Sequence, residues 1–496
     1  MVRNFAVVLS GTLFTVLAQT PCESLKSLSL PDTSITAAEL VPAAPVSNVG
    51  NPTAPAAAAQ PPMLPAYCRV AAVLKPSSDS HIEMEAWLPA SDWNGKFQAV
   101  GNGGWAGSIN FRMMAAALQE GYATASTDTG HKGGSASFAV GHPEKVFDNA
   151  YRAVHEMAVK SKAILATYYG RGPRLSYWNS CSNGGRQGLM EAQRYPEDFD
   201  GIIAGASGIN RVGISAWFVA LAAAIGRDPA SFVPAHKAAL LNKAVLAACD
   251  ALDGVKDGLL NNPLICQFDP ATLLCRRGDA NNCLTAPQVE AVKMAYAPAK
   301  KRTGELIYPG MPPGSELGWG FLAGGAPDGR IATFRDVLYQ DPKWDWRAFD
   351  LDRDTALAEE KAGYLNAINP DLAAFKARGG KLLLYHGWND SLNSAQNSIN
   401  YYSSVLAKMG RKQDNWLRLF LAPGMGHCGG GPGPNQFNFL GALERWRESG
   451  VAPDQILGSH VTSNRVDMTR PLCPYPQIAV YKGIGSTNDA ANFACQ

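Results

Sequence analysis

Two dipeptides, Cys181-Ser182 and His427-Cys428, together contain a nucleophile and a base. A disulfide between the two cysteines would hold their Cα atoms about 5.5 Å apart, so the neighbouring serine and histidine side chains could meet. A serine hydroxyl is a weak nucleophile near neutral pH, and an imidazole within hydrogen-bond reach activates it by removing its proton. These residues therefore predict a serine hydrolase.

The residues around Ser182 fit a sharp turn between a strand and a helix. An apolar strand is expected over 175–181, and a helix over 186–194. Residues 180–185 read Ser-Cys-Ser-Asn-Gly-Gly, in which a serine replaces the first glycine of the usual G-x-S-x-G pattern. Small residues on both sides are what such a strained turn requires. Glycine-flanked serines are also common in plain turns, so the surrounding elements must decide between the two.

An aspartate and a histidine follow two later predicted strands. Apolar strands are expected over 381–387 and 417–421, and Asp390 follows the first while His427 follows the second. The order serine, aspartate, histidine, each just past the end of a strand, is that of an α/β-hydrolase. His386 is a rival for the base, but it precedes Asp390 and would break this order.

An oxyanion hole needs two N–H groups directed at the developing negative charge. One is expected from Asn183, which follows the nucleophile. The other is expected from Gly103 or Gly104, because the glycine-rich segment 101–107 follows a short predicted strand over 97–100. The choice between the two glycines is left open at this point.

The bulk composition limits the classes of partner. The 496-residue chain, with 46% hydrophobic and 17% charged residues, is long enough for a large domain with an insertion. Its 44 basic and 42 acidic residues are scattered, without the basic runs that bind nucleic acids or membrane surfaces. We therefore expect a small, roughly neutral partner and no nucleic acid. Alternating predicted strands and helices indicate a mostly parallel sheet with helices on both faces.

The N-terminus has the pattern of an export signal. Residues 1–18 contain Arg3, an apolar run and a small-residue site that ends at Ala18. The run is too short to span a membrane, and a buried helix is the alternative. Residues 19–66 are expected to form a Pro/Ala-rich, extended segment. Export to the periplasm or the medium also fits the ten cysteines, an even number that allows complete pairing.

The middle of the chain reads as an insertion. The alternating pattern fades between Ala206 and Leu372, and a lid domain is expected over 211–359, between the nucleophile strand and the acid strand. The catalytic domain would then consist of 67–210 and 360–496. An insertion at this point of the hydrolase order would cover the active site.

A possible metal loop lies inside this insertion. Asp250, Asp253 and Asp257 are three carboxylates within eight residues, in a stretch with glycines that let the chain curl. They could converge on one hard cation, with the carbonyls of Val255 and Leu259 completing an oxygen shell. Calcium is the natural candidate outside the cell. The spacing is not that of an EF-hand, and a hydrated acidic turn is the alternative.

Together these residues resemble the tannase and feruloyl esterase family, which includes the bacterial mono(2-hydroxyethyl) terephthalate hydrolase. The resemblance extends from about Cys68 to Cys495. The segments that carry it are 101–107, 181–185, 250–259, 386–390 and 426–428.

The resemblance implies an α/β-hydrolase with a lid, a Ser182–His427–Asp390 triad and a Cys181–Cys428 disulfide beneath it. It also implies a structural calcium ion in the lid, held by the five residues named above, and substrates that are esters of aromatic acids, such as feruloyl, galloyl and chlorogenate esters. The other disulfides that it implies, together with the sequential spacing, are Cys22–Cys68, Cys249–Cys266, Cys275–Cys283 and Cys473–Cys495.

The main hypothesis is therefore a secreted or periplasmic serine esterase of the feruloyl esterase or tannase type. One alternative is a hydrolase of chlorogenate or terephthalate monoesters. Another is a non-catalytic, hydrolase-like protein whose lid pocket retains ligands. A third makes Cys181 a thiol nucleophile with His427 as its base, which export and the even cysteine count disfavour. The oligomeric state is left open.

Overall fold

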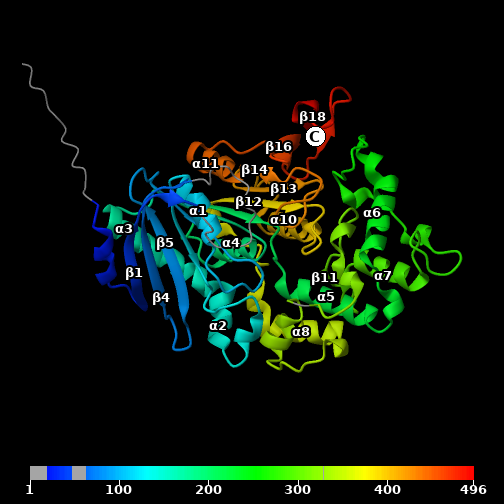
Figure 1. The fold of residues 1–496 in the computed structure, drawn as a ribbon, viewed down its shortest axis with the longest axis horizontal. Helices are drawn as coiled ribbons and strands as arrows, with labels where there is room; N and C mark the ends of the chain where they lie inside the picture. The colour runs from blue at the N-terminus through cyan, green and yellow to red at the C-terminus, as the bar shows by residue number, and fades with distance from the viewer. Residues whose placement is uncertain (1–18, 47–62, 328) are drawn as a thin grey trace, which may run out of the picture.

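A nine-stranded sheet forms the centre of the molecule (Figure 1). The computed structural model describes residues 19–46, 63–327 and 329–496. The strand order is β1-β4-β5-β7-β6-β8-β9-β12-β13; the pairs from β1 to β7 are antiparallel and those from β7 to β13 are parallel. The strands are β1 (Thr33–Val41), β4 (Tyr67–Leu74), β5 (Ile82–Pro89), β6 (Lys96–Ala99), β7 (Ala123–Thr127), β8 (Leu175–Cys181), β9 (Gly201–Gly205), β12 (Lys381–Gly387) and β13 (Leu417–Ala422).

Helices cover both faces of this sheet. Apolar residues of α3, α4 and α10 pack into one core with strand residues such as Trp178 and Leu384. On the other face, α1 and α11 pack with strand residues such as Tyr177 and Leu383. Because both faces are covered, the central parallel strands are apolar almost throughout. These helices are α1 (Phe111–Gln119), α3 (Ala153–Tyr169), α4 (Asn183–Arg194), α10 (Ala395–Met409) and α11 (Phe439–Ser449).

The sheet begins earlier in the chain than the expected boundary at residue 67. Strand β1 pairs with β4 along its whole length, and Ile35 of β1 lies in the main core. A helical turn over Cys22–Ser27 packs there as well, joined to β4 by the Cys22–Cys68 disulfide. The Pro/Ala-rich composition starts only after β1, so residues 33–41 are strand rather than extended linker. The expected export signal lies outside the described residues.

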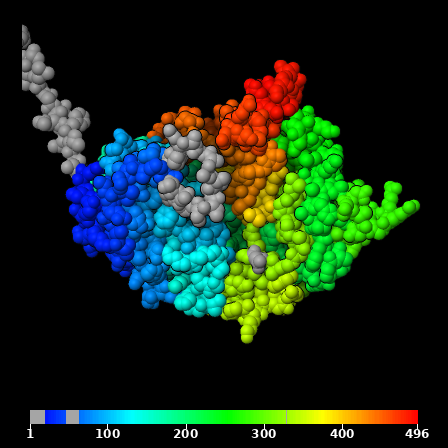
Figure 2. Space-filling model, viewed as in Figure 1, coloured from blue at the N-terminus to red at the C-terminus, as the bar shows by residue number. Residues whose placement is uncertain are grey.

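The insertion has a hydrophobic core of its own, whose residues all lie between Val212 and Ala358. It is mainly helical, and Figures 1 and 2 show it in green to yellow, with its green helices on the side of the molecule away from the blue N-terminal strands. Its entry and exit are joined, because the N–H of Ala367 donates to the carbonyl of Ile209 at 2.8 Å. Its main elements are α5 (Arg211–Ile225), α6 (Ala235–Cys249), α7 (Ala286–Tyr296), β10 (Ala299–Lys300), β11 (Leu306–Tyr308) and α8 (Leu351–Ala362).

The C-terminal part adds short antiparallel strands beside the main sheet, at the top of Figure 1. They are β14 (Gln436–Phe437), β15 (Ile456–Thr462), β16 (Arg465–Leu472), β17 (Ala479–Tyr481) and β18 (Phe493–Cys495). None of the helices in the described residues combines the length and apolar character needed to cross a bilayer.

Five disulfides connect these parts of the chain, and no cysteine among the described residues is free. They are the five pairs that the family resemblance implies. Two lie inside the insertion, one ties the N-terminal turn to the sheet, one closes the C-terminal strands and one lies at the end of β8. The pairs are Cys22–Cys68, Cys181–Cys428, Cys249–Cys266, Cys275–Cys283 and Cys473–Cys495.

Candidate active site

Ser182 occupies a strained turn between β8 and α4. Its backbone has φ 64° and ψ −125°, a conformation that non-glycine residues rarely adopt. The helix that follows is pressed against the sheet, since a Cβ atom on Gly184 would overlap the Ser180 side chain and one on Gly185 would overlap Gly205. The sequence pattern around Ser182 is thus explained by close packing. Ser180 also accepts a hydrogen bond from the N–H of Gly101 at 3.3 Å, which ties the turn to the glycine-rich segment.

The structure brings Ser182, His427 and Asp390 into one hydrogen-bonded chain. His427 Nε2 lies 2.8 Å from Ser182 Oγ, and His427 Nδ1 lies 2.7 Å from Asp390 Oδ2. With the proton on Nδ1, the imidazole donates to the carboxylate and accepts from the serine hydroxyl. This is the geometry in which histidine can take the serine proton as the serine attacks a carbonyl carbon.

His386, the rival base, contacts the acid rather than the serine. It is fully buried, with Nε2 3.0 Å from both Asp390 Oδ2 and the Asn393 carbonyl, and Nδ1 2.8 Å from Ser398 Oγ. These partners fit the tautomer of His386 that carries its proton on Nε2 and donates it to the Asp390 carboxylate and the Asn393 carbonyl. Sequence order disfavours His386 as the base but does not reveal this second contact to Asp390.

The carboxylate of Asp390 is ionised although no part of it reaches solvent. Burial alone would raise its pKa, but hydrogen bonds from His386 and His427 hold the pKa well below its usual range. The backbone N–H groups of Leu392 and Asn393 also donate to its other oxygen, at 2.8 and 2.9 Å. A fixed negative charge beside His427 stabilises the imidazolium that forms when the histidine takes a proton.

A cavity of about 630 Å³ opens above the serine. The expected oxyanion residues Asn183, Gly103 and Gly104 line it together with Ser182 and His427. Among the described residues, none of the three expected N–H donors has a hydrogen-bond acceptor, so all three are free to bind a substrate oxygen. The structure thus leaves the choice between the two glycines open.

Two arginines that the sequence analysis did not single out also line this cavity. Arg211 lies 3.9 Å from the centroid of the Trp105 ring, and Arg330 lies 4.7 Å from that of Phe218. In the described part of the chain, neither forms an ion pair with a carboxylate. Burial, together with the charges of Arg186 and Arg330, lowers the pKa of Arg211. Isolated arginines carry no spacing signal, and the folding of the insertion alone brings them here.

The Cys181–Cys428 disulfide forms part of the cavity wall. Its two Cα atoms are 5.9 Å apart, and the residues next to them are the serine and the histidine of the hydrogen-bonded chain. Because Cys181 is bonded, it has no thiol to act as a nucleophile, which excludes the thiol alternative for this structure.

The acidic loop of the insertion holds three partly buried carboxylates. Asp250 and Asp253 accept hydrogen bonds from backbone N–H groups of the same loop, while Asp257 pairs with the buried Arg470 at 2.7 Å. Burial raises the pKa of Asp253, and the charges of Asp257 and Asp250 raise it further. The three carboxylates face one buried guanidinium, while Lys256 of the same loop is exposed, and such an oxygen-rich acidic group fits a divalent cation.

A second group of possible metal ligands lies outside the insertion. Among the described residues, His155, Glu191 and Asp198 form the one set of three possible metal-ligating side chains whose ligand atoms all lie within 4.8 Å. His155 lies on α3, Glu191 lies on α4 and Asp198 precedes β9, so the group is outside the insertion. His155 Nδ1 is 2.6 Å from Asp198 Oδ2, and burial raises the pKa of Glu191 well above its usual value. Sequence spacing gave no indication of this group.

The parallel sheet, the strained serine turn and the histidine–aspartate chain define an α/β-hydrolase. Residues 68–496 match the family model described as Tannase and feruloyl esterase. An uncharacterized esterase of Xanthomonas campestris pv. campestris is 38% identical over 551 residues, covering 100% of this chain and 94% of that protein. A probable feruloyl esterase B-1 of Aspergillus flavus is 34% identical, covering 94% of this chain and 93% of that protein.

The same likeness holds in three dimensions. The crystal structure of feruloyl esterase B from Aspergillus oryzae matches with a TM-score of 0.90 at 32% identity, over 96% of this chain and 99% of that one. The chain therefore belongs to the tannase and feruloyl esterase family. It is a carboxylic ester hydrolase with an α/β-hydrolase fold, as the resemblance in its sequence implies.

The depressed pKa of Asp390 predicts a pH-dependent contribution to stability. An unfolded aspartate titrates near ~3.9, so the contribution is complete above about pH 5 and is lost as the pH falls toward the lower folded value. We expect the difference in free energy of unfolding between wild type and Asp390→Asn to shrink as the pH falls from about 4 to 3. Urea denaturation at a series of pH values measures it.

The matched control is Asp454→Asn, a change at an exposed aspartate, which should alter the free energy of unfolding by less than about 0.5 kcal/mol. A difference for Asp390→Asn that stays level down to about pH 3 would contradict the ionised, doubly hydrogen-bonded carboxylate.

Proposed function

We propose that this enzyme hydrolyses esters of aromatic, phenolic acids by two-step acyl transfer. Ser182 attacks the ester carbonyl while His427 takes its proton, and Asp390 orients and stabilises the imidazolium. The N–H of Asn183 and that of Gly103 or Gly104 hold the oxyanion. His427 then protonates the departing alcohol, and water releases the acid. The observation that carries the proposal is the continuous hydrogen-bonded chain from Ser182 to the buried Asp390.

A second recess supports an aromatic acyl group. It has a volume of about 370 Å³ inside the insertion and shares Arg330 and Leu392 with the cavity above the serine. Phe218 and Phe321 line it and provide flat, apolar surfaces suited to a phenolic ring. We therefore assign residues 211–359 the role of a lid domain over a catalytic domain of 67–210 and 360–496, to which β1 also belongs.

We further infer that the enzyme works outside the cytoplasm, after removal of an N-terminal export signal. Five disulfides and no free cysteine among the described residues support this inference, because such bonds persist in oxidising compartments.

Replacement of the nucleophile tests the mechanism. Ser182→Ala should abolish hydrolysis of methyl ferulate and methyl gallate, with a loss of about 10⁴-fold or more in kcat. The variant places a methyl group beside His427, where the wild type has the hydroxyl that attacks the ester. The thermal unfolding midpoint should stay near that of the wild type. Turnover that survives in Ser182→Ala would remove Ser182 from the mechanism.

A fluorophosphonate probe separates an enzyme from a hydrolase-like binding protein. Wild type should be labelled covalently, while Ser182→Ala and heat-unfolded wild type should not. A protein that binds ferulate without hydrolysing esters or reacting with the probe would support the non-catalytic alternative.

Arg211 and Arg330 donate hydrogen bonds to carbonyl and asparagine oxygens but, in the described part of the chain, to no carboxylate, which favours a second candidate, an ester that carries an additional carboxylate. Arg330 and Arg211 line the cavity without a carboxylate partner among the described residues, so an anionic group of a terephthalate monoester or of chlorogenate could pair with them. A charged hydrogen bond contributes about 1.5–3 kcal/mol. Such an ester therefore gains more from these residues than a neutral ester does.

Arg330→Gln tests this candidate. The ratio of kcat/KM for a terephthalate monoester to that for methyl ferulate should fall by roughly 10- to 100-fold, because the variant loses a charge that only the first substrate uses. Arg347→Gln, at an exposed arginine paired with Asp345, is the control and should leave the ratio unchanged. An unchanged ratio in Arg330→Gln would restrict the proposal to neutral esters.

We also propose a structural calcium ion in the insertion. Asp250, Asp253 and Asp257 would bind it, with the carbonyls of Val255 and Leu259, and the ion would offset the mutual repulsion of the three carboxylates. It has no part in the chemical steps and would hold the loop beside Arg470, to which Asp257 is paired.

Removal of calcium should lower the thermal unfolding midpoint by a few degrees. A ligand that binds only the folded state at about 100 times its Kd adds ~2.7 kcal/mol of stability, which a chelator removes. EGTA should therefore shift the melting curve and excess calcium should restore it, while Asp253→Asn should melt lower and respond little to either. A melting point insensitive to EGTA, with no metal found by elemental analysis, would refute the ion.

A further inference from the structure

One buried side chain ties the glycine-rich segment 101–107 to the helix that follows the nucleophile. Gln187 lies on α4, one helical turn after Asn183, and is 1% exposed. Its Oε1 accepts a hydrogen bond from the N–H of Asn102 at 3.1 Å, and its Nε2 donates one to Asn102 Oδ1 at 3.3 Å. The two residues are 85 positions apart in the sequence, so this pair joins two distant parts of the chain.

Asn102 is held from its other side as well. Its Nδ2 donates to the carbonyl of Ser108 at 2.6 Å and to that of Thr127, the last residue of β7, at 2.8 Å. The N–H of Asn102 is already bonded to Gln187 and cannot serve a substrate. Among the described residues, the free N–H groups that follow begin at Gly103. Asn102 is therefore fixed between α4 and the sheet, directly before the expected oxyanion donors.

The segment also touches the helix without an intervening side chain. A Cβ atom on Gly101 would lie 2.4 Å from Gln187 Oε1, 2.7 Å from the Trp178 ring and 2.9 Å from Gly184 Cα. Contacts this short do not occur, so only glycine lets the backbone approach so closely. The spacing between the segment and α4 is thus set by direct contact with Gln187 and with the helix backbone.

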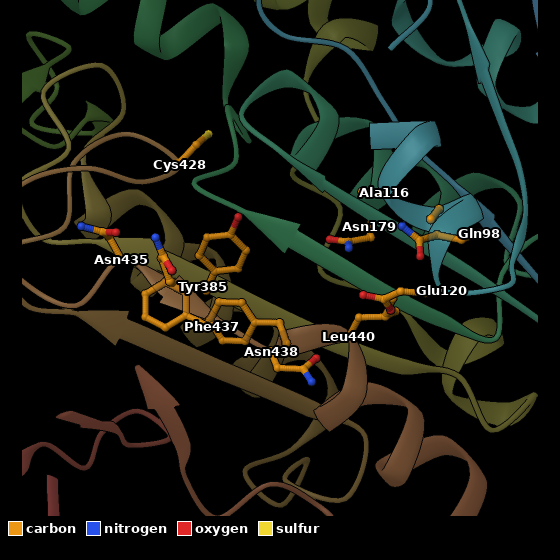
Figure 3. A pocket seen from close by; sticks show the side chains of 13 residues that line it. Gln98, Ala116, Glu120, Asn179, Tyr385, Cys428, Asn435, Phe437, Asn438 and Leu440 are labelled. Atoms are coloured by element: carbon orange, nitrogen blue, oxygen red, sulfur yellow. The ribbon is translucent and has the colours of Figure 1, made fainter. Parts of the chain in front are cut away.

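These contacts lie on one face of the sheet. Side chains alternate between the two faces along a strand. Gln98 of β6 and Asn179 of β8 line a recess on the face opposite to α4 (Figure 3). Ser180, next to Asn179, therefore faces α4, where its Oγ accepts a hydrogen bond from Gly101. A replacement of Gln187 consequently acts on the α4 face, where the oxyanion donors are.

The spacing matters because an oxyanion hole works only when both N–H groups reach one oxygen. Each donor must lie about 2.7–3.1 Å from the position of the oxyanion. One donor belongs to Asn183 at the start of α4, and the other belongs to Gly103 or Gly104. A misplacement of about 1 Å can lower a rate on the order of 100-fold. The side chain that fixes the segment against α4 therefore also fixes the distance between the two donors.

We propose that Gln187 is a positioning residue for the oxyanion hole. It does not line the cavity above the serine, and it acts through Asn102 rather than on the substrate. The proposal rests on the acyl-transfer mechanism proposed above and deepens it, because it names the residue that sets the geometry of the two N–H donors.

Gln187→Met tests this role, since it keeps the length of the side chain but removes the amide. The kcat for methyl ferulate should fall about 10- to 100-fold while KM stays within about twofold, because the oxyanion forms only in the transition state. Gln187→Glu keeps an acceptor for the N–H of Asn102 and should retain more of kcat than Gln187→Met. Gln187→Asn, whose amide is one methylene too short to reach Asn102, should show the same split and provides the test if Gln187→Met does not fold.

Gln193→Met is the matched control on the same helix. Gln193 Nε2 donates to the Ala367 carbonyl at 2.8 Å and to the Tyr401 hydroxyl at 2.9 Å, without contacting the glycine-rich segment. Both methionine variants lose two hydrogen bonds, so their thermal unfolding midpoints should fall by similar amounts. Gln193→Met should nevertheless keep the wild-type kcat.

A pair of inhibitors separates positioning from general loosening of the site. An aryl trifluoromethyl ketone forms a bond between Ser182 Oγ and its carbonyl carbon; the serine proton passes to His427 and the carbonyl oxygen becomes an oxyanion. Its Ki should rise in Gln187→Met by about the factor by which kcat falls. Coniferyl alcohol keeps the phenolic ring but has no carbonyl, so its Ki should stay unchanged.

The outcomes distinguish this role from the mechanism on which it rests. Wild-type kcat and ketone affinity in Gln187→Met and Gln187→Asn would refute the role of Gln187 and leave the Ser182 mechanism in place. An equal loss of kcat in Gln193→Met would show a general effect of α4 packing and would also refute the role. Turnover that survives in Ser182→Ala would refute the proposed mechanism, and the positioning role with it.

Discussion

The burial of one ionised carboxylate, that of Asp390, is the constraint on which the arrangement of this site depends. A charge removed from water is strongly destabilising unless hydrogen bonds replace its hydration. Four donors do so here: two imidazoles and two backbone N–H groups of the loop after β12. The loop must therefore turn sharply around the carboxylate, and His386 must be anchored to Ser398 on α10. His427 is then held at one orientation, with its free nitrogen directed at Ser182.

The disulfide imposes a second constraint from the other side of the base. Cys181 ends β8 and Cys428 follows β13, and two strands of the sheet, β9 and β12, lie between them. The bond therefore crosses the carboxyl edge of the sheet over residues that are 247 apart in sequence. A cross-link of this kind restricts the unfolded chain, and in the folded chain it fixes the turn that carries His427. Hydrogen bonds alone would leave that glycine-rich turn more freedom.

The residues at strand ends were predictable from the sequence, and those in the insertion were not. Parallel strands bring their carboxyl ends to one edge, so Ser182, Asp390 and His427 could be placed together from three apolar runs and their order. Arg211 and Arg330 reach the cavity through the packing of irregular segments, which no periodicity reveals. His386 was visible, but its contact with Asp390 depends on the turn that follows β12. Strand β1, at the edge of the sheet, was not expected because the Pro/Ala-rich stretch follows it directly and dominates the composition of the segment.

The hydrogen bond between Ala367 and Ile209 has a consequence for the evolution of this family. The insertion leaves the sheet and returns to it at a single point, and its hydrophobic core is built from its own residues alone. A segment with adjacent ends and an independent core can be lengthened, shortened or exchanged without disturbing the strands that precede Ser182 and Asp390. Divergence in substrate range can then proceed through replacement of one module, while the chemistry beneath it stays the same.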